Sequence, residues 1–297
     1  MKFRTEYEAK KAPFFLNPEV PVVVVGSCFT QNIASRMEAH NWQFFNPAGT
    51  LYNPISIAYA LDMMLDEETG LSRFEESLFE YNGLWNSHWF DSSFSSIERQ
   101  DCIKEFLNRK QRLATSLNEG KVLIVTFGTS ICYYLQEDHV PVGNCHKQPS
   151  TLFYKERLGI SEIESYWTPV IKRLQEKIEN IRIIFTVSPV RHLKDGFEGN
   201  ARSKAILLLG IEEICRNNDR CFYFPAYEIL TDDLRDYRFY ASDLVHPSDE
   251  GINYIWEKFV DTFIDDNGRK QLLEGEKIVK AINHRPKTGA LGKPLKA

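Results

Sequence analysis

The chain has 297 residues, of which 43% are hydrophobic and 26% are charged, and its formal net charge at pH 7 is -5. This apolar fraction is enough for a substantial core, and the weakly acidic balance does not favour binding to nucleic acid or to an anionic membrane surface. The N-terminal stretch has no apolar core of export length, and no apolar run approaches the length of a membrane span. We therefore expect a soluble cytoplasmic protein with no nucleic-acid or membrane partner.

In chain order, the first predicted strand covers residues 21–26, and a helix follows Ser27 through Met37. Further strands are predicted at 121–127, 181–187 and 221–224. Each is a near-continuous apolar run, which is typical of strands buried on both faces of a parallel sheet. Apolar positions at helical spacing predict the remaining helices at 55–65, 97–117, 163–178, 201–217 and 248–263.

Strands and helices alternate along the chain, which indicates a doubly wound α/β protein with a mostly parallel sheet. Residues 41–96 are rich in Trp, Phe, Asn and Pro and fit this alternation less well, so we interpret them as a loop and helix insertion. We expect one domain over residues 1–265. Residues 266–297 form a C-terminal extension, and its end, "HRPKTGALGKPLKA", is expected to be loose.

The six cysteines are scattered without Cys-x-x-Cys pairs, which favours free thiols over a disulfide framework or a zinc site. No GxGxxG or GxxxxGK[ST] pattern follows any predicted strand. We therefore expect no metal and no cofactor, and a cofactor-binding α/β protein is the weakest of the functional hypotheses.

The first strand ends at "VGSCF". A nucleophile at such a strand-to-helix turn is exposed at the sheet edge, and the helix N-terminus stabilises developing negative charge. Gly26 permits the tight backbone and Ser27 supplies a hydroxyl, although a serine at this position can also simply cap the helix. The Cys28 side chain is expected to turn into the packing, with its N–H group available as an oxyanion donor.

A second polar motif, "YASDLVHPSDEG", precedes the last strongly predicted helix. Asp243 and His246 are three residues apart, so a short turn can bring the carboxylate to one ring nitrogen and leave the other free. That is the arrangement of a general base with its orienting carboxylate. Together with Ser27 it predicts nucleophilic catalysis.

These features resemble those of the SGNH (GDSL-like) hydrolases. "GSCFT" is similar to the Gly-Ser-Cys-Phe-Ala signature of the GSCFA family, with Thr30 in the last place. The likeness covers roughly residues 20–263, through "FNPAGTLYNP", "GNCHKQP", "TVSPVRHLKDG", "NARSKA", "YFPAYEI" and "DYRFYASDLVHPS". It implies a flavodoxin-like three-layer α/β/α sandwich, the SGNH hydrolase fold, with Ser27 as nucleophile and His246 as base.

The oxyanion hole departs from the SGNH pattern. Those enzymes carry a Gly after the second strand and a Gly-x-Asn-Asp block after the third, whereas here "GTSI" follows the strand at 121–127, with Gly128 matching and Ser130 in place of the Asn. Acyl transfer still needs several donors aimed at the oxyanion. We expect Asn144 and the backbone at Gly49 to replace the missing block.

The loop "GNCHKQP" offers an amide, a thiol, an imidazole and a cation within four residues, from Asn144 through Cys145 and His146 to Lys147. Three interpretations compete: substrate contacts, a Cys145 nucleophile, or half of a metal site completed by His88 or His192. We favour substrate contacts, because no strand-to-helix turn is predicted beside Cys145 to activate its thiol.

Arg191, His192 and Lys194 follow the third strong strand and are expected to approach the same cleft, where an arginine suits an anionic or sugar-like ligand. The alternative is that they form surface ion pairs with Asp195 and Glu198. In "WNSHWF", two tryptophans flank His88 and suggest a carbohydrate-stacking wall, although aromatic residues at this spacing are more often core.

The sequence therefore predicts a serine esterase-type hydrolase or acyltransferase, with Ser27, His246 and Asp243 as catalytic residues. The expected substrate is a small-molecule or glycan ester, with an O-acylated carbohydrate as a candidate. The alternative is a non-catalytic carbohydrate- or ligand-binding module on a hydrolase scaffold, which the incomplete oxyanion pattern favours.

Overall fold

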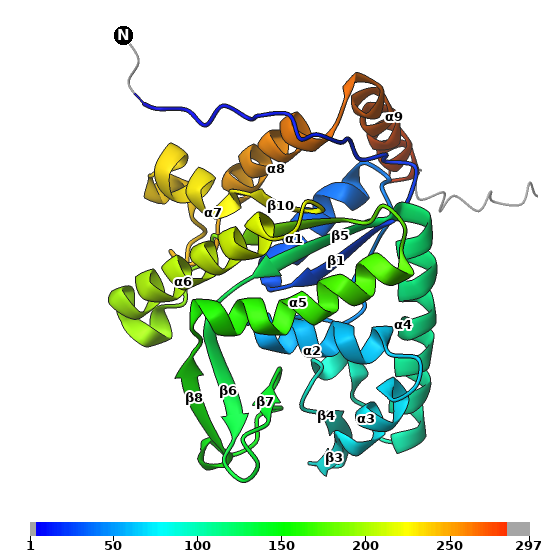
Figure 1. Cartoon of the computed structure of the whole chain (residues 1–297). Coiled ribbons are helices and arrows are strands. Elements are labelled where there is room, and N and C mark those ends of the chain that lie inside the picture. Colours follow the sequence, from blue (N-terminus) through cyan, green and yellow to red (C-terminus); the bar gives the residue numbers. More distant parts are fainter. Residues whose placement is uncertain (1–3, 284–297) are drawn as a thin grey trace, which may run out of the picture.

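The computed structural model describes residues 4–283, and a five-stranded parallel sheet lies at its centre (Figure 1). The strand order is β10-β9-β5-β1-β2, and every neighbouring pair is parallel. The strands are β1 (Val22–Gly26), β2 (Phe44–Phe45), β5 (Val122–Phe127), β9 (Arg182–Val187) and β10 (Cys221–Phe224). The four strands predicted from continuous apolar runs are confirmed to within one residue at each end.

Helices cover both faces of the sheet because side chains of each strand alternate between two apolar cores. Val23 and Val25 of β1 face one core, and Val22 and Val24 face the other. The first core is packed by α2 (Pro54–Leu65), α3 (Gly70–Glu76), α4 (Arg99–Gly120), α5 (Ile160–Lys177) and α6 (Gly196–Arg216). The second is packed by α1 (Cys28–Ala39), α7 (Ala226–Glu228), α8 (Asp249–Phe263) and α9 (Asp266–Asn283). The predicted helices and the parallel α/β arrangement are thus confirmed.

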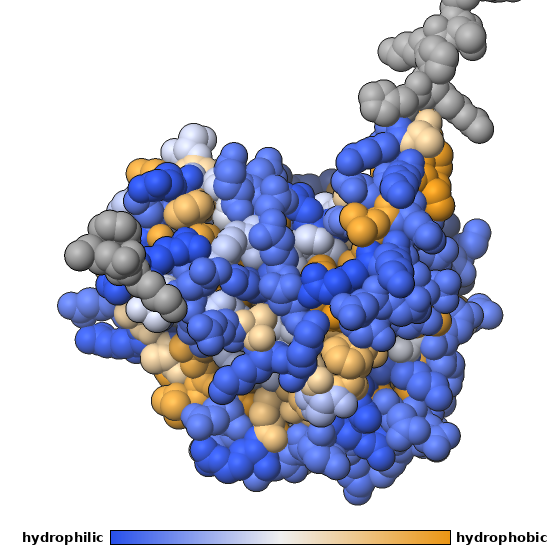
Figure 2. All heavy atoms as spheres, turned by 90° about the horizontal axis from the view of Figure 1, so that it is seen from above, coloured by the Kyte–Doolittle hydropathy of each residue, from blue (hydrophilic) through white to orange (hydrophobic). Residues whose placement is uncertain are grey.

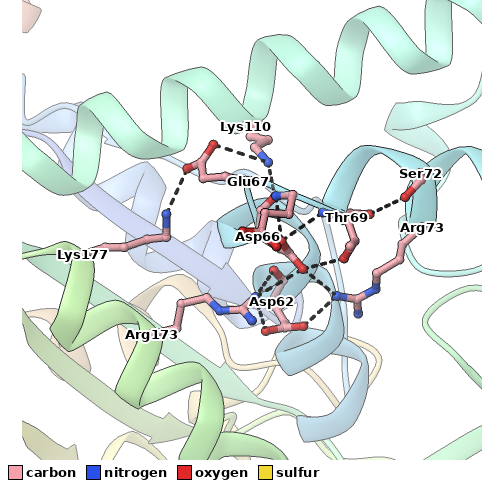
Figure 3. A network of polar contacts seen from close by, with 10 residues as sticks. Asp62, Asp66, Glu67, Thr69, Ser72, Arg73, Lys110, Arg173 and Lys177 are labelled. Carbon is pink, nitrogen blue, oxygen red and sulfur yellow. Dashed lines mark hydrogen bonds and ion pairs between the residues drawn. The ribbon is translucent and has the colours of Figure 1, made fainter.

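The predicted insertion is built around α2 and α3, followed by the antiparallel hairpin of β3 (Leu78–Tyr81) and β4 (Leu84–Ser87). A network of ion pairs ties its helices to the rest of the layer (Figure 3). Asp62 of α2 accepts hydrogen bonds from Arg73 of α3, at 2.8 Å, and forms an ion pair with Arg173 of α5, at 2.7 Å. Lys177 of α5 reaches Glu67 at 3.0 Å. The insertion is therefore an integral part of this helical layer.

Strand β2 and the β3–β4 hairpin, both within residues 41–96, were not predicted, and two elements outside that stretch were also missed. One is a small antiparallel sheet of β6 (Ile131–Leu135), β7 (Pro141–Val142) and β8 (Phe153–Arg157), which lies apart from the central sheet at one end of the molecule (Figure 1). The other is α9, which lies in the stretch expected to be a partly loose extension. The tail predicted to be loose falls mostly at 284–297, outside the described residues.

No helix within residues 4–283 is long and apolar enough to cross a membrane. The face seen from above, over α8 and α9, is mostly hydrophilic with smaller apolar areas between the polar ones (Figure 2). Leu273, Ile278 and Ile282 of α9 are among the exposed large hydrophobic residues.

Candidate active site

The turn between β1 and α1 is held by backbone contacts. Gly26 has a φ of +132°, and a Cβ atom there would lie 2.1 Å from the carbonyl oxygen of Thr126, so only glycine fits. The N–H group of Ser27 donates to the same oxygen at 3.1 Å. Ser27 is the N-cap residue of α1, but its side chain makes no capping hydrogen bond. Its Oγ is buried and has no hydrogen-bond partner among the described residues.

Cys28, the first residue of α1, faces a cleft, and its Sγ lies 3.8 Å from Nε2 of His246. The prediction that this side chain turns into the packing is therefore wrong. The two side chains point in different directions because Ser27 is the extended N-cap residue and Cys28 is the first helical residue of α1. The Cys28 thiol, not the Ser27 hydroxyl, therefore lies beside the imidazole of His246.

The environment of the Cys28 thiol acts on its pKa in two directions. Burial, the largest effect, raises the pKa. The N–H groups of Phe29 and Cys28 at the start of α1, and the ammonium of Lys204, lower it in part. The net direction is upward, so the thiol is protonated at rest and needs a base to become a nucleophile.

The imidazole of His246 is positioned by a tight turn. Nδ1 of His246 lies 2.7 Å from Oδ2 of Asp243, while Oδ1 of Asp243 accepts the N–H groups of Val245 and His246 at 2.9 and 3.0 Å. These backbone hydrogen bonds, followed by the one from the imidazole, lower the pKa of Asp243 to about 2. Leu244 takes a φ of +59°, a left-handed conformation that closes the turn. The sequence prediction that Asp243 orients His246 agrees with this geometry.

The cleft has a volume of about 650 Å³ and lies where β1, β5 and β9 end. The remaining wall comes from the loop before α8 and from the loop that follows β7. Because β5 lies on one side of β1 and β2 on the other, the order in which strands are added to the sheet reverses at β1, and ligand sites of open parallel sheets lie at such a point. Lining residues outside the predicted set include Tyr52, Asn53, Thr129, Tyr133 and Cys145.

The predicted oxyanion donors are only partly available. The Gly128 N–H group already donates to the Tyr52 carbonyl at 2.7 Å. Gly49 does not line the cleft, and a Cβ there would strike the Asp91 carboxylate at 2.2 Å. The predictions that Gly128 and Gly49 donate to the oxyanion are therefore wrong. Asn144 does line the cleft; its Oδ1 accepts from the backbone of the same loop, and its NH₂ group has no partner within residues 4–283.

Three predicted substrate contacts, His88, His146 and Lys147, do not line the cleft. His88 stacks on Phe79 with ring centroids 4.0 Å apart. The His146 Nε2 lies 2.8 Å from the Ser87 carbonyl oxygen, and Lys147 is exposed. The expectation that these residues contact a substrate in this cleft is therefore wrong.

The carbohydrate-stacking wall and the metal site also lack a structural basis here. Neither Trp85 nor Trp89 lines the cleft, and Trp89 stacks on Tyr59 at 4.4 Å. Within residues 4–283, no group of three or more His, Cys, Asp or Glu side chains is arranged to hold a metal ion.

Arg191 and His192 line the cleft, as predicted. Burial and then the charge of Lys204 lower the pKa of His192 to about 4, so this imidazole is neutral at pH 7. Arg191 does not form the alternative surface ion pair with Asp195, because Asp195 is bound by Lys155 instead.

Lys204 of α6 was missed by the sequence analysis. Its Nζ is fully buried and donates to the carbonyl oxygens of Gly128 and Ser188, at 2.7 and 2.6 Å, so it joins the loops that follow β5 and β9. Burial lowers its pKa to about 7. A sequence signal existed: Lys204 lies three and seven residues before Leu207 and Ile211, on the apolar stripe of its helix.

Fold and site together define an α/β protein with a thiol, an imidazole and a carboxylate aligned at the carboxyl edge of a parallel sheet. The model of the GSCFA family matches residues 21–259, and the chain belongs to that family. The matched span includes the β1–α1 turn and the turn that carries His246. No curated protein matches the chain.

Proposed function

We propose that this protein is an acyl-transfer enzyme, an esterase-type hydrolase or acyltransferase, whose nucleophile is Cys28. The observation that carries the proposal is the line of three groups: Sγ of Cys28 is 3.8 Å from Nε2 of His246, whose Nδ1 is 2.7 Å from Asp243. A nucleophile beside a base that is itself oriented by a third group is the general signature of covalent catalysis.

In the proposed reaction, the Cys28 thiol gives its proton to Nε2 of His246 as Sγ attacks the acyl carbonyl. The tetrahedral intermediate collapses to a thioester, and the imidazolium returns the proton to the departing alcohol. Water or another alcohol, deprotonated by His246, then attacks the thioester; the bond between Sγ and the acyl carbon breaks, and the imidazolium returns the proton to Sγ of Cys28. Because the pKa of Asp243 is held at about 2, its carboxylate stays ionised and stabilises the imidazolium throughout.

The oxyanion needs donors close to Sγ. The N–H groups of Cys28 and Phe29 face the thiol at the start of α1, and the side-chain NH₂ of Asn144 lies in the same cleft. This set replaces the donors predicted at Gly128 and Gly49. We therefore expect Asn144→Ala to lower kcat more than it changes KM.

We further propose that the enzyme belongs to the SGNH class of hydrolases. The order of the site residues along the chain supports this: the proposed nucleophile comes directly after the first strand, and Asp-x-x-His comes before α8, on a parallel sheet with helices on both faces. In this proposal the thiol of Cys28 takes the place of the serine hydroxyl, and Ser27 has no role as nucleophile.

The test is hydrolysis of p-nitrophenyl acetate and butyrate by the wild type and by Cys28→Ala, Ser27→Ala and His246→Ala, with intact-mass detection of the iodoacetamide adduct. We expect turnover to fall at least about a hundredfold in Cys28→Ala and His246→Ala, the scale of a lost general base. Ser27→Ala should remain active. Cys145→Ala, which removes the other thiol of the cleft, is the matched control and should keep the adduct at Cys28.

Loss of turnover in Ser27→Ala with turnover kept in Cys28→Ala would reverse the assignment and restore a serine mechanism. A wild type with no turnover on either ester and no acyl adduct would favour the alternative, a binding module on a hydrolase scaffold.

A further inference from the structure

We propose that Arg191 binds an anionic group of the substrate, so that the compound acylating Cys28 carries a carboxylate or a phosphate. This inference deepens the proposed function and rests on it. The two kinds of anion present the same oxygen acceptors to a guanidinium, and the experiment below separates them.

The guanidinium of Arg191 is held in place by aromatic rings. Its Cζ lies 4.3 Å from the ring centroid of Tyr240 and 5.0 Å from that of Tyr237. Its Nη1 donates to the Tyr237 hydroxyl at 3.2 Å. These contacts hold the guanidinium in place, so the side chain loses little further entropy when a ligand binds.

Most hydrogen-bond donors of this guanidinium remain for a ligand. An arginine carries five N–H donors, and within residues 4–283 no carboxylate forms an ion pair with Arg191. The two acidic residues that line or adjoin the cleft have other partners, because Asp195 binds Lys155 and Asp243 binds His246.

The charge of the cleft has the sign that an anion requires. Lys194 also lines it and forms no ion pair among the described residues, while His192 is neutral at pH 7 because its pKa is about 4. Lys155 neutralises Asp195, whereas the Asp243 carboxylate stays ionised beside the imidazole of His246. The cationic side chains of Arg191 and Lys194 outnumber that one carboxylate, so the net charge of the cleft is positive, which attracts an anionic substrate and orients it.

Arg191 is also connected to the base. Its backbone N–H donates to the carbonyl of Val245, the residue that precedes His246, at 3.2 Å. The anion-binding group and the general base thus lie on two loops that are hydrogen-bonded to each other. A substrate anchored at Arg191 would present its carbonyl group to a base held by the same pair of loops.

The first measurement compares the anionic ester mono-4-nitrophenyl glutarate with the neutral 4-nitrophenyl valerate. We expect kcat/KM to favour the glutarate by about tenfold, the effect of one charge-assisted hydrogen bond, and Arg191→Gln to abolish that ratio. Arg191→Lys keeps the charge but not the stacked plane and should give an intermediate ratio. Arg202→Gln, which removes an exposed arginine paired with Glu198, is the matched control and should keep the wild-type ratio.

The second measurement needs no turnover. Glutarate and inorganic phosphate are tested for protection of Cys28 against iodoacetamide, followed by intact mass. Protection in the wild type that is lost in Arg191→Gln supports the anion site even if no ester is turned over, and the anion that protects at the lower concentration identifies the class. Ester turnover with no glutarate preference and no protection would overturn the anion site and leave the acyl-transfer proposal standing.

Discussion

The buried lysine beneath the site gives a quantitative prediction for stability. The Lys204 ammonium is removed from water and has no carboxylate partner within residues 4–283, and burial lowers its pKa from the ordinary lysine value of 10.5 to about 7. Between these two values the unfolded chain binds more protons than the folded one, so the free energy of unfolding rises with pH. From pH 7 to pH 9 the gain from this one group is about 2 kcal/mol.

The assay is urea unfolding of the wild type and Lys204→Met at pH 7 and pH 9. The methionine leaves the carbonyls of Gly128 and Ser188 without their donor, so the difference in stability between the two proteins at a single pH also contains the loss of these hydrogen bonds. The change of that difference with pH isolates the titration of the ammonium, because the other titrating groups are common to both proteins. We expect the wild type to gain about 2 kcal/mol relative to Lys204→Met between the two pH values.

Lys258→Met is the matched control. Burial lowers the pKa of Lys258, but its hydrogen bonds to Glu6 and Tyr254 outweigh burial and the net direction is upward. Lys258 therefore keeps its proton in both states at pH 7 and pH 9, and its substitution should change stability equally at both. Parallel pH dependence of wild type and Lys204→Met would refute the reasoning for Lys204.

Two further predictions concern the turn and the helical layer. Gly26→Ala should destabilise the protein by about 3 kcal/mol or more in thermal unfolding, because the new Cβ would strike the Thr126 carbonyl oxygen. The control Gly83→Ala also has a positive φ but open space around it, so it should cost only about 1 kcal/mol. Equal losses of stability in the two variants would contradict this prediction. Hydrogen bonds from the Thr69 hydroxyl and N–H hold the pKa of Asp66 at about 2, below the ordinary aspartate value of 3.8. The stabilisation by the ionised Asp66 carboxylate is therefore present above pH 4 and lost toward pH 2. Asp66→Asn should lower the free energy of unfolding by about 1 kcal/mol at pH 7. A loss of stability that did not shrink in acid would rule out this role of the carboxylate.

Much of the fold could be predicted because its signals are local. Continuous apolar runs require burial on both faces, which only a parallel sheet covered by helices provides, and the four strong strands follow from that requirement. The β6–β8 sheet could not be predicted in this way. Its strands are short and partly exposed, and their pairing depends on contacts across a long loop.

The sequence by itself determined the pairing of Asp243 with His246, because these residues are only three apart. It also predicted a tight turn at Gly26, although the contact that requires glycine there comes from Thr126 on the neighbouring strand β5. Only the tertiary structure decided which side chain faces the imidazole. The change from the extended N-cap Ser27 to the first helical residue Cys28 separates the buried hydroxyl from the thiol, and the imidazole of His246 that the thiol meets lies 218 positions away in the chain. The stacked plane of Arg191 and the buried ammonium of Lys204 were likewise decided by packing, because their partners are brought together by elements far apart in sequence.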